Sequence, residues 1–322
     1  MNHVWNRREF LAASAVAGVG LLAADRLRAA PFQHKLHKAI IGNPGEATLQ
    51  ELKEAGFDGM ESDRGNATPE EAAAARKIAE KLGLRIHSLL KGWMNFNSPD
   101  QSKVAADIAS VTRALHAAAA YGAEDILLVP CRVGGMPMPE PWEFDIEFDE
   151  KTSHVKRVVK GDNAKYAKYI EAQNDATDSS RAAVRKLIPV AEKCQIIIGL
   201  ENVWNNLWVK PDLARNFVAS FDSPWVRAYF DIGNHVKYAP PEQWVRTLGK
   251  LIIRCHVKDF KLKPDGHGGN FCKIREGSVN WPAVRQALDD VGYDRWMTIE
   301  LQGTILSLPE QSKRLDLILA GK

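Results

Sequence analysis

The chain has 322 residues, of which 45% are hydrophobic and 26% are charged. This ordinary globular composition excludes a disordered chain, a collagen-like fibre and a disulfide-dense miniprotein. Its 43 basic and 40 acidic residues give a formal charge of +3, which provides no general footprint for nucleic acid or a membrane surface. The four cysteines are too few for a disulfide scaffold and form no CxxC pair.

The first thirty residues differ in pattern from the rest of the chain. An apolar run over 10–24 follows Arg7 and Arg8; a membrane-spanning helix needs about twenty residues, so the run instead has the length of a signal-peptide apolar region. The paired arginines followed by Glu-Phe-Leu resemble a twin-arginine export signal. We therefore interpret residues 1–30 as a signal for export to the periplasm or the cell exterior, with only transient membrane contact. An uncleaved membrane anchor is the alternative.

From residue 38 onward, short apolar segments of strand length alternate with longer helical patterns. The predicted strands cover 38–42, 57–62, 84–90, 125–129, 195–201, 226–231, 251–258 and 296–301. The predicted helices cover 46–55, 69–82, 102–121, 164–193, 211–221, 241–248, 281–291 and 309–319. Residues 131–162 are rich in proline and acidic residues, and we interpret them as a loop inserted over the active-site rim. Residues 259–280 are predicted to form a second loop, rich in glycine and lysine.

This alternation predicts a fold of the α/β class. Eight strand–helix units favour a (β/α)₈ TIM barrel that occupies residues 31–322 as a single domain. An open, doubly wound sheet is the competing interpretation. It would usually carry a GxGxxG motif after the first strand, and residues 41–45 do not match that motif.

Acidic and histidine side chains occur at the ends of four consecutive predicted strands. They are Glu201, Asp231, His256 and Glu300. Because the carboxyl ends of barrel strands meet at one rim, we expect these side chains to lie together. Three carboxylates in one ring repel each other unless a cation lies between them. Two Glu, one Asp and one His suit Mn²⁺ best, with Mg²⁺, Co²⁺ or Zn²⁺ as alternatives.

A metal at this rim would have a definite chemistry. A divalent cation chelated by a carbonyl and a neighbouring hydroxyl stabilises an enediolate. A carboxylate on each side of the reacting carbon can remove a proton and return one. Glu201 and Glu300 lie on strands three apart, so both are candidates for metal binding and for acid–base catalysis.

The segments around these residues resemble a known family. Residues 52–61, 199–205, 229–234, 256–260, 276–281 and 298–300 are similar to the sugar phosphate isomerase/epimerase family, a xylose-isomerase-like group of TIM barrels that includes ketose 3-epimerases. The resemblance covers roughly residues 38–320. It implies that Glu201, Asp231, His256 and Glu300 are the metal ligands and that Glu201 and Glu300 are the acid–base pair.

Further residues near the predicted rim are candidate substrate contacts. They are His87, Trp93, His235, Lys258 and Arg275. Core packing is the alternative for His87 and Trp93. Family members often place a histidine three residues after the ligand aspartate, whereas His235 lies four residues after it, and they often supply an arginine from the loop that holds Arg275. Asn202 and Asn234 are expected to hold the carboxylates in place. Glu61 is expected to orient substrate or only to pair with Arg64.

The leading hypothesis for function is a divalent-metal-dependent isomerase or epimerase. Its substrate would be a small unphosphorylated sugar or keto-sugar, because phosphorylated sugars are scarce outside the cell. The alternative is a lyase that eliminates the aglycone from 3-keto-glycosides by the same chemistry. An abasic-site endonuclease is disfavoured by charge and export, so no nucleic-acid partner is expected. A non-catalytic sugar-binding barrel is disfavoured because all four ligands are present, and a homo-oligomer is left open.

Overall fold

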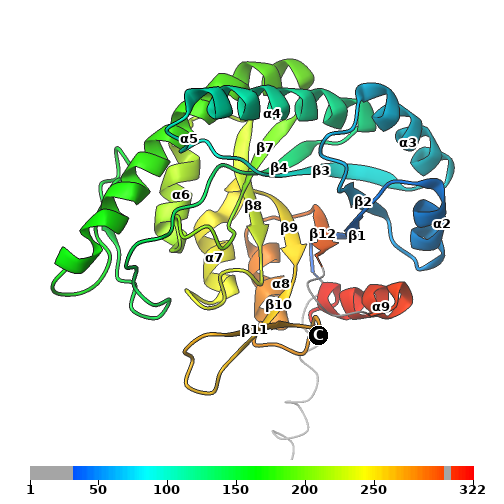
Figure 1. The fold of residues 1–322 in the computed structure, drawn as a ribbon. Coiled ribbons are helices and arrows are strands. Elements are labelled where there is room, and N and C mark those ends of the chain that lie inside the picture. The colour runs from blue at the N-terminus through cyan, green and yellow to red at the C-terminus, as the bar shows by residue number, and fades with distance from the viewer. Residues whose placement is uncertain (1–31, 301–305) are drawn as a thin grey trace, which may run out of the picture. The chain divides into compact units, whose positions relative to one another are not determined.

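The computed structural model describes residues 32–300 and 306–322. The chain divides into a unit of residues 1–33 and a unit of residues 34–322, and the predicted export signal lies outside the described residues. The second unit contains a closed barrel of eight parallel strands with helices between them (Figure 1), which confirms the predicted (β/α)₈ fold. Among the described helices, none combines the length and apolar character needed to cross a membrane.

The barrel strands follow the predicted ones closely. They are β1 (His37–Gly42), β2 (Gly59–Ser62), β3 (Arg85–Trp93), β4 (Asp125–Val129), β7 (Ile197–Glu201), β8 (Val226–Asp231), β9 (Ile252–Val257) and β12 (Trp296–Ile299). Their order around the barrel is β1-β12-β9-β8-β7-β4-β3-β2. β4 and β9 are buried along their whole length, as is usual for parallel strands covered on both faces.

The helices surround the barrel, and their ends are marked by sequence signals. They are α2 (Glu46–Glu54), α3 (Pro69–Lys81), α4 (Gln101–Tyr121), α5 (Ala167–Cys194), α6 (Pro211–Ala219), α7 (Pro241–Leu248), α8 (Trp281–Asp290) and α9 (Leu308–Leu319). Thr68 and Glu71 form a capping box at the start of α3. Gly122 ends α4 in the left-handed conformation, with φ of 72°. Short 3₁₀ turns, η2 (Ala164–Tyr166) and η3 (Gly249–Leu251), precede α5 and β9.

The two long loops contain more structure than the sequence predicted. Within the insertion 131–162, β5 (Glu147–Phe148) pairs with β6 (Val155–Arg157), and within 259–280, β10 (Asp259–Leu262) pairs with β11 (Gly269–Cys272). The rings of Trp142 and His267 stack with their centroids 4.2 Å apart, so the two loops touch each other. The strands escaped prediction because segments of two to four residues are too short to show a period.

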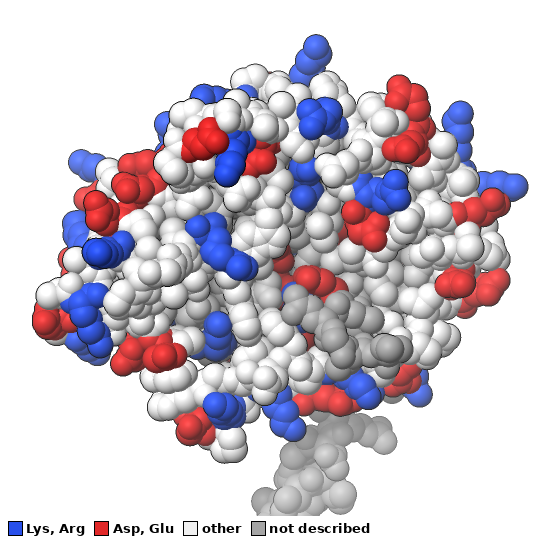
Figure 2. Space-filling model, in the orientation of Figure 1, with Lys and Arg blue, Asp and Glu red and all other residues white. Residues whose placement is uncertain are grey.

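The barrel interior is partly polar. A small apolar cluster of Leu127, Val129 and Tyr229 lies there. The buried polar side chains of the barrel strands include Glu61, His87, Ser88, Asp125, Arg254 and Thr298. Because alternate residues of a strand face the same side, the residues two positions before the predicted ligands lie one layer deeper in the barrel. Over the face seen in Figure 2, basic and acidic side chains are interspersed, in line with the small net charge.

Candidate metal centre

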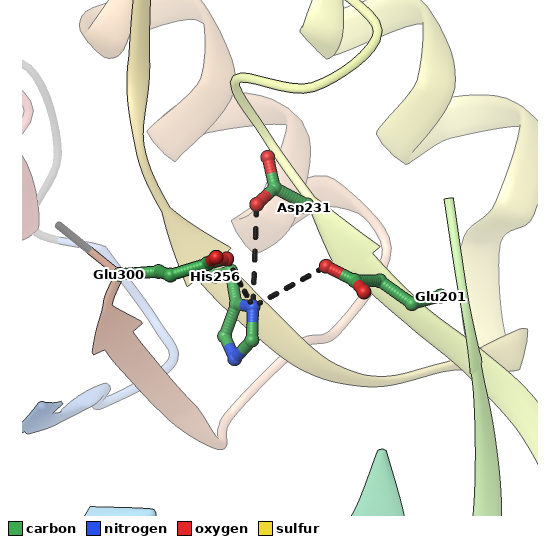
Figure 3. Close-up of side chains that lie close together, drawn as sticks. All are labelled: Glu201, Asp231, His256 and Glu300. Carbon is green, nitrogen blue, oxygen red and sulfur yellow. Dashed lines mark ion pairs between the residues drawn. The ribbon is translucent and has the colours of Figure 1, made fainter. Parts of the chain in front are cut away.

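The structure brings Glu201, Asp231, His256 and Glu300 together. Glu201 and Asp231 end β7 and β8, His256 lies near the end of β9, and Glu300 directly follows β12. The register pairs Asp231 with His256 across neighbouring strands, which sets the side chains at one rim. One ligand atom from each of the four lies within 4.8 Å of the others, and Figure 3 shows the side chains converging from separate strands.

The two nitrogens of His256 have different surroundings. Nδ1 lies 3.0 Å from Glu300 Oε2, 3.6 Å from Glu201 Oε1 and 4.0 Å from Asp231 Oδ2 (Figure 3). Nε2 lies 2.7 Å from Glu61 Oε2. A carboxylate can only accept a hydrogen bond, so Nε2 carries the hydrogen and Nδ1 is the nitrogen available to a metal.

Charge is concentrated at this rim. The ammonium of Lys258 lies 2.8 Å from Glu300 Oε2 and 3.1 Å from Asp231 Oδ2. Burial raises the pKa of Glu201, and burial raises that of Asp231 to about 7. Burial also disfavours ionised Glu300, but His256 and Lys258 outweigh it and lower the pKa of this carboxyl.

The pKa of His256 is well above its usual value. Burial disfavours the imidazolium, but Glu61, Glu201 and Glu300 outweigh that effect. Without a metal, Nδ1 therefore holds a proton that faces the three carboxylates. A metal ligand must be deprotonated, so a divalent cation would take the place of this proton.

The residues fit a divalent cation. His256 Nδ1, Asp231 Oδ2 and Glu300 Oε2 are buried and lie at ion-pair distances, yet within the described part of the chain none makes a hydrogen bond of good geometry. Buried polar atoms are normally hydrogen-bonded. Three buried atoms that converge on one point, held by ion pairs and without a well-formed hydrogen bond, are expected of ligands whose partner is a cation. Three carboxylates and one imidazole form a mostly oxygen donor set that suits several divalent metals.

Two asparagines hold the ligands, as expected from the sequence. The Asp231 backbone N–H donates to Asn202 Oδ1 at 2.6 Å, and Asn202 Nδ2 donates to the Asp231 carbonyl at 2.8 Å. The Asn234 N–H donates to Asp231 Oδ1 at 2.6 Å, and Asn234 Nδ2 donates to Glu201 Oε1 at 3.4 Å. These bonds fix the orientation of two carboxylates before any ligand binds.

A cavity of about 400 Å³ is lined by three of the four side chains, Glu201, His256 and Glu300, and its volume is within the usual range of small-molecule sites. Glu201, His256, Lys258 and Glu300 supply its polar part. Its aromatic part is made by Trp93, Trp204 and Phe271. The Trp93 ring is 43% exposed at this cavity, and the Arg132 guanidinium lies 4.4 Å from its centre.

Of the predicted substrate contacts, Trp93 and Lys258 line the cavity, whereas His87 does not. His87 is completely buried; it accepts a hydrogen bond from Arg254 at Nδ1, and its Nε2 lies 3.0 Å from Thr298 Oγ1. Burial, reinforced by the Arg254 charge, lowers the pKa of His87 well below its usual value. The expected position of His87 near a strand end was wrong, because β3 runs on to Trp93.

His235 and Arg275 also lie away from the cavity lining. His235 is buried, with Nε2 3.0 Å from the Val203 carbonyl and its ring against Tyr238 and Trp244. Arg275 is exposed in the loop after β11. Its backbone N–H donates to Asp259 at 2.9 Å. His235 therefore packs behind the rim and does not face the cavity.

Three residues near the site were missed or misplaced by sequence reasoning. Arg132 and Phe271 line the cavity; Arg132 stands three residues beyond β4, a rim position that could have been noticed. Glu61 is completely buried and contacts His256 and Tyr229. The expected pairing of Glu61 with Arg64 was wrong, because Glu61 faces the barrel interior.

Comparison with known proteins extends this description. An uncharacterised protein of Methanocaldococcus jannaschii is 30% identical over 133 residues, which are 39% of this chain and 44% of that protein; the match thus spans less than half of that curated relative. The structure of 3-keto-D-glucoside 4-epimerase from E. coli has a TM-score of 0.65 at 14% identity, covering 88% of this chain and 99% of that one. The IolI protein with a bound zinc atom has a TM-score of 0.66 at 15% identity, covering 88% and 96%.

At these identities the two solved structures show a shared fold. The match to a family is broader, because residues 49–316 match the family described as xylose isomerase-like TIM barrel. That segment contains seven of the eight barrel strands and all four converging side chains. The chain therefore belongs to the xylose isomerase-like TIM barrel family.

Proposed function

We propose that the protein is a divalent-metal-dependent isomerase or epimerase that acts on an unphosphorylated sugar or keto-sugar. The observation that carries this proposal is the shared position of Glu201 and Glu300. Both belong to the converging set of ligand atoms, and both line the same cavity. The fold shared with a protein named as a 3-keto-D-glucoside 4-epimerase supports a sugar as substrate.

The two glutamates would move the proton. One carboxylate removes a proton from the carbon next to a carbonyl, and the other returns a proton to the same carbon or its neighbour. A divalent cation held by Glu201, Asp231, His256 and Glu300 would supply positive charge that stabilises the negative charge developing on the substrate oxygens. Lys258 forms an ion pair with Glu300, so the two glutamates have different electrostatic surroundings. Such a difference allows one to act as the acid and the other as the base.

The rest of the cavity suits a neutral sugar. Lys258 has three donors, and it lines the cavity while contacting two carboxylates. It can therefore orient a substrate hydroxyl or carbonyl oxygen. The Trp93, Trp204 and Phe271 rings provide apolar surface for the faces of a sugar ring. The unphosphorylated substrate rests on the export signal proposed for residues 1–30, because phosphorylated sugars are scarce outside the cell.

The lyase remains the second candidate, and the cavity mouth supplies an observation in its favour. Trp93 is 43% exposed and stacked under Arg132, so an aromatic aglycone could stack there. One glutamate would remove the proton from carbon 2, next to the 3-keto group, the double bond between carbons 1 and 2 would form as the bond from carbon 1 to the aglycone oxygen breaks, and the other glutamate would protonate that oxygen. The export signal proposed for residues 1–30 would bring either enzyme to glycosides outside the cytoplasm.

Proton NMR in D₂O tests the proposal, with the Mn²⁺-loaded protein and free ketoses, aldoses and 3-keto-glycosides as substrates. Removing the metal before acquisition keeps the spectra sharp. Deuterium entering next to a carbonyl of an intact sugar is the expected result. Release of an aglycone with an unsaturated sugar would establish the lyase instead. Glu300→Gln should abolish exchange, whereas Glu310→Gln, on the exposed face of α9, should not. Absence of exchange with all three classes would contradict the proposal.

A further inference from the structure

Glu61 is a buried acidic residue on β2 that the proposed reaction does not use. Its side chain is completely buried. Oε2 lies 2.7 Å from His256 Nε2 and accepts a hydrogen bond from the Tyr229 hydroxyl at 2.7 Å. Oε1 lies 3.5 Å from the Ser88 hydroxyl. One carboxylate oxygen of β2 thus receives two short hydrogen bonds from the neighbouring strands β8 and β9 across the barrel.

Tyr229 reaches Glu61 because the strand beside it makes room. Tyr229 lies two residues before Asp231 on β8, one layer below the rim. Its neighbour across the ladder is Glu201, and Gly199 lies two residues before that ligand. A Cβ on Gly199 would come within 2.8 Å of the Tyr229 ring, closer than real Cβ atoms approach. The glycine therefore lets the ring fill the barrel interior and point its hydroxyl at Glu61.

This arrangement decides which nitrogen of His256 faces the rim. Hydrogen bonding of Nε2 to Glu61 leaves Nδ1 directed at Glu201, Asp231 and Glu300. A neutral imidazole has one donor and one acceptor nitrogen, so a fixed Nε2–H makes Nδ1 the ligand. A carboxylate partner also makes the imidazole a stronger ligand.

We propose that Glu61, held by Tyr229, is a positioning residue for the metal centre, setting the tautomer and ring orientation of His256. This inference rests on the proposed metal-dependent function. It adds to that function a layer of supporting side chains, Glu61 and Tyr229, below the metal ligands. The Tyr229 hydroxyl acts through Glu61, because it contacts Glu61 and Ser88 and no ligand carboxylate in the described structure. The Tyr229 ring also packs edge-on against the His256 ring, with centroids 4.7 Å apart, and Tyr229→Phe removes the hydroxyl while keeping this ring contact.

Asp125 offers a matched control in the same barrel interior. It is completely buried, like Glu61, and it lies 2.8 Å from the Arg254 guanidinium. No hydrogen bond or ion pair joins it to Glu201, Asp231, His256 or Glu300 within the described part of the chain. Asp125 interacts with Glu61 and Ser88 but with none of the four ligands, so Asp125→Asn should change the stability of the barrel and alter metal affinity far less than Glu61→Gln does.

The test is the Kd of Mn²⁺ for the metal-free protein, measured by titration calorimetry. Glu61→Gln removes the charge with little change in shape, and it should raise the Kd about 10- to 100-fold. Tyr229→Phe should raise the Kd by a smaller factor. In the Glu61→Gln background, Tyr229→Phe should add little, because both changes act through one contact. In the Zn²⁺-loaded protein, the NMR signal of His256 Nε2–H should move on Glu61→Gln substitution.

The outcomes separate this inference from the proposal on which it rests. If the wild type binds no divalent metal, the metal centre itself is refuted. If the wild type binds Mn²⁺ and Glu61→Gln binds it equally well, the positioning role is refuted, whatever happens to thermal stability. Equal loss of affinity in Asp125→Asn would also overturn the inference, because it would show a general response to buried charge.

Discussion

Replacing Lys258 with methionine should separate metal binding from catalysis. The Lys258 side chain is only 3% exposed, and its ammonium lies 2.8 Å from Glu300 and 3.1 Å from Asp231. At an effective dielectric constant of about 20, each attraction amounts to about 5–6 kcal/mol before the cost of burying the charges. Removing one partner of a buried pair usually destabilises a protein by about 3–5 kcal/mol.

The size of the effect should depend on the metal. Unfolding entropy of about 2.1 cal/mol/K per residue converts 3–5 kcal/mol into a fall in Tm of about 5–8 °C for a barrel of this length. A divalent cation replaces the missing positive charge, so the loss should be smaller in the loaded protein. By linkage, a variant destabilised more without metal than with it binds that metal more tightly. Recovery of about 2 kcal/mol corresponds to a Kd about 30-fold lower.

Thermal unfolding with and without Mn²⁺, together with calorimetric titration, measures both quantities. Lys258→Met should show a larger metal-induced rise in Tm and a lower Kd than the wild type, with strongly reduced kcat because the substrate oxygen loses its donor. Lys38→Met is the control, since Lys38 pairs with Asp316 outside the site and should respond equally with and without metal. Weaker Mn²⁺ binding by Lys258→Met would refute the electrostatic reasoning.

Three further predictions follow from other parts of the chain. Burial lowers the pKa of His235 from 6.5 to about 3. As the pH decreases from 7 to 4.5, the unfolded chain therefore gains a proton that the folded chain excludes, and the free energy of unfolding decreases by about 2.5 kcal/mol. His235→Gln should reduce this pH dependence in urea unfolding of the metal-free protein, and an unchanged pH dependence would contradict the role given to His235. Trp93→Ala should raise KM several-fold with little change in kcat, because the ring offers binding surface away from the reacting atoms; a loss confined to kcat would contradict that role. Arg7→Lys combined with Arg8→Lys should leave the protein in the cytoplasm on cell fractionation, and unchanged export would disprove the twin-arginine signal.

The barrel was predictable from the sequence because strands and helices have different hydrophobic periodicities, which alternate along the chain. All eight predicted barrel strands and their helices are present. The error in the predicted end of the third strand arose at a register shift between two strands. The register of β3 against β4 shifts between Leu90 and Gly92, so the strand continues past the point where its apolar pattern stops. That continuation places His87 deep in the barrel rather than near the rim.

The convergence of the four ligand candidates was predictable for a geometric reason. Each follows an apolar strand, and parallel strands deliver their carboxyl ends to one rim. The contacts in the layer of side chains beneath the ligands were harder to predict from the sequence. The spacing of two residues places Tyr229 below Asp231, but nothing local to Tyr229 indicates that Glu61, 168 residues earlier, lies opposite it. Contacts across the barrel depend on tilt and stagger, which a single strand does not reveal.

The most direct test of the central claim is the metal content of the purified protein, measured by elemental analysis after loading with Mn²⁺ and removal of free metal. The convergence of Glu201, Asp231, His256 and Glu300 predicts about one divalent ion per wild-type chain. Glu201→Gln and His256→Ala should each retain far less. Normal stoichiometry in both variants would contradict the claim that these side chains hold the metal.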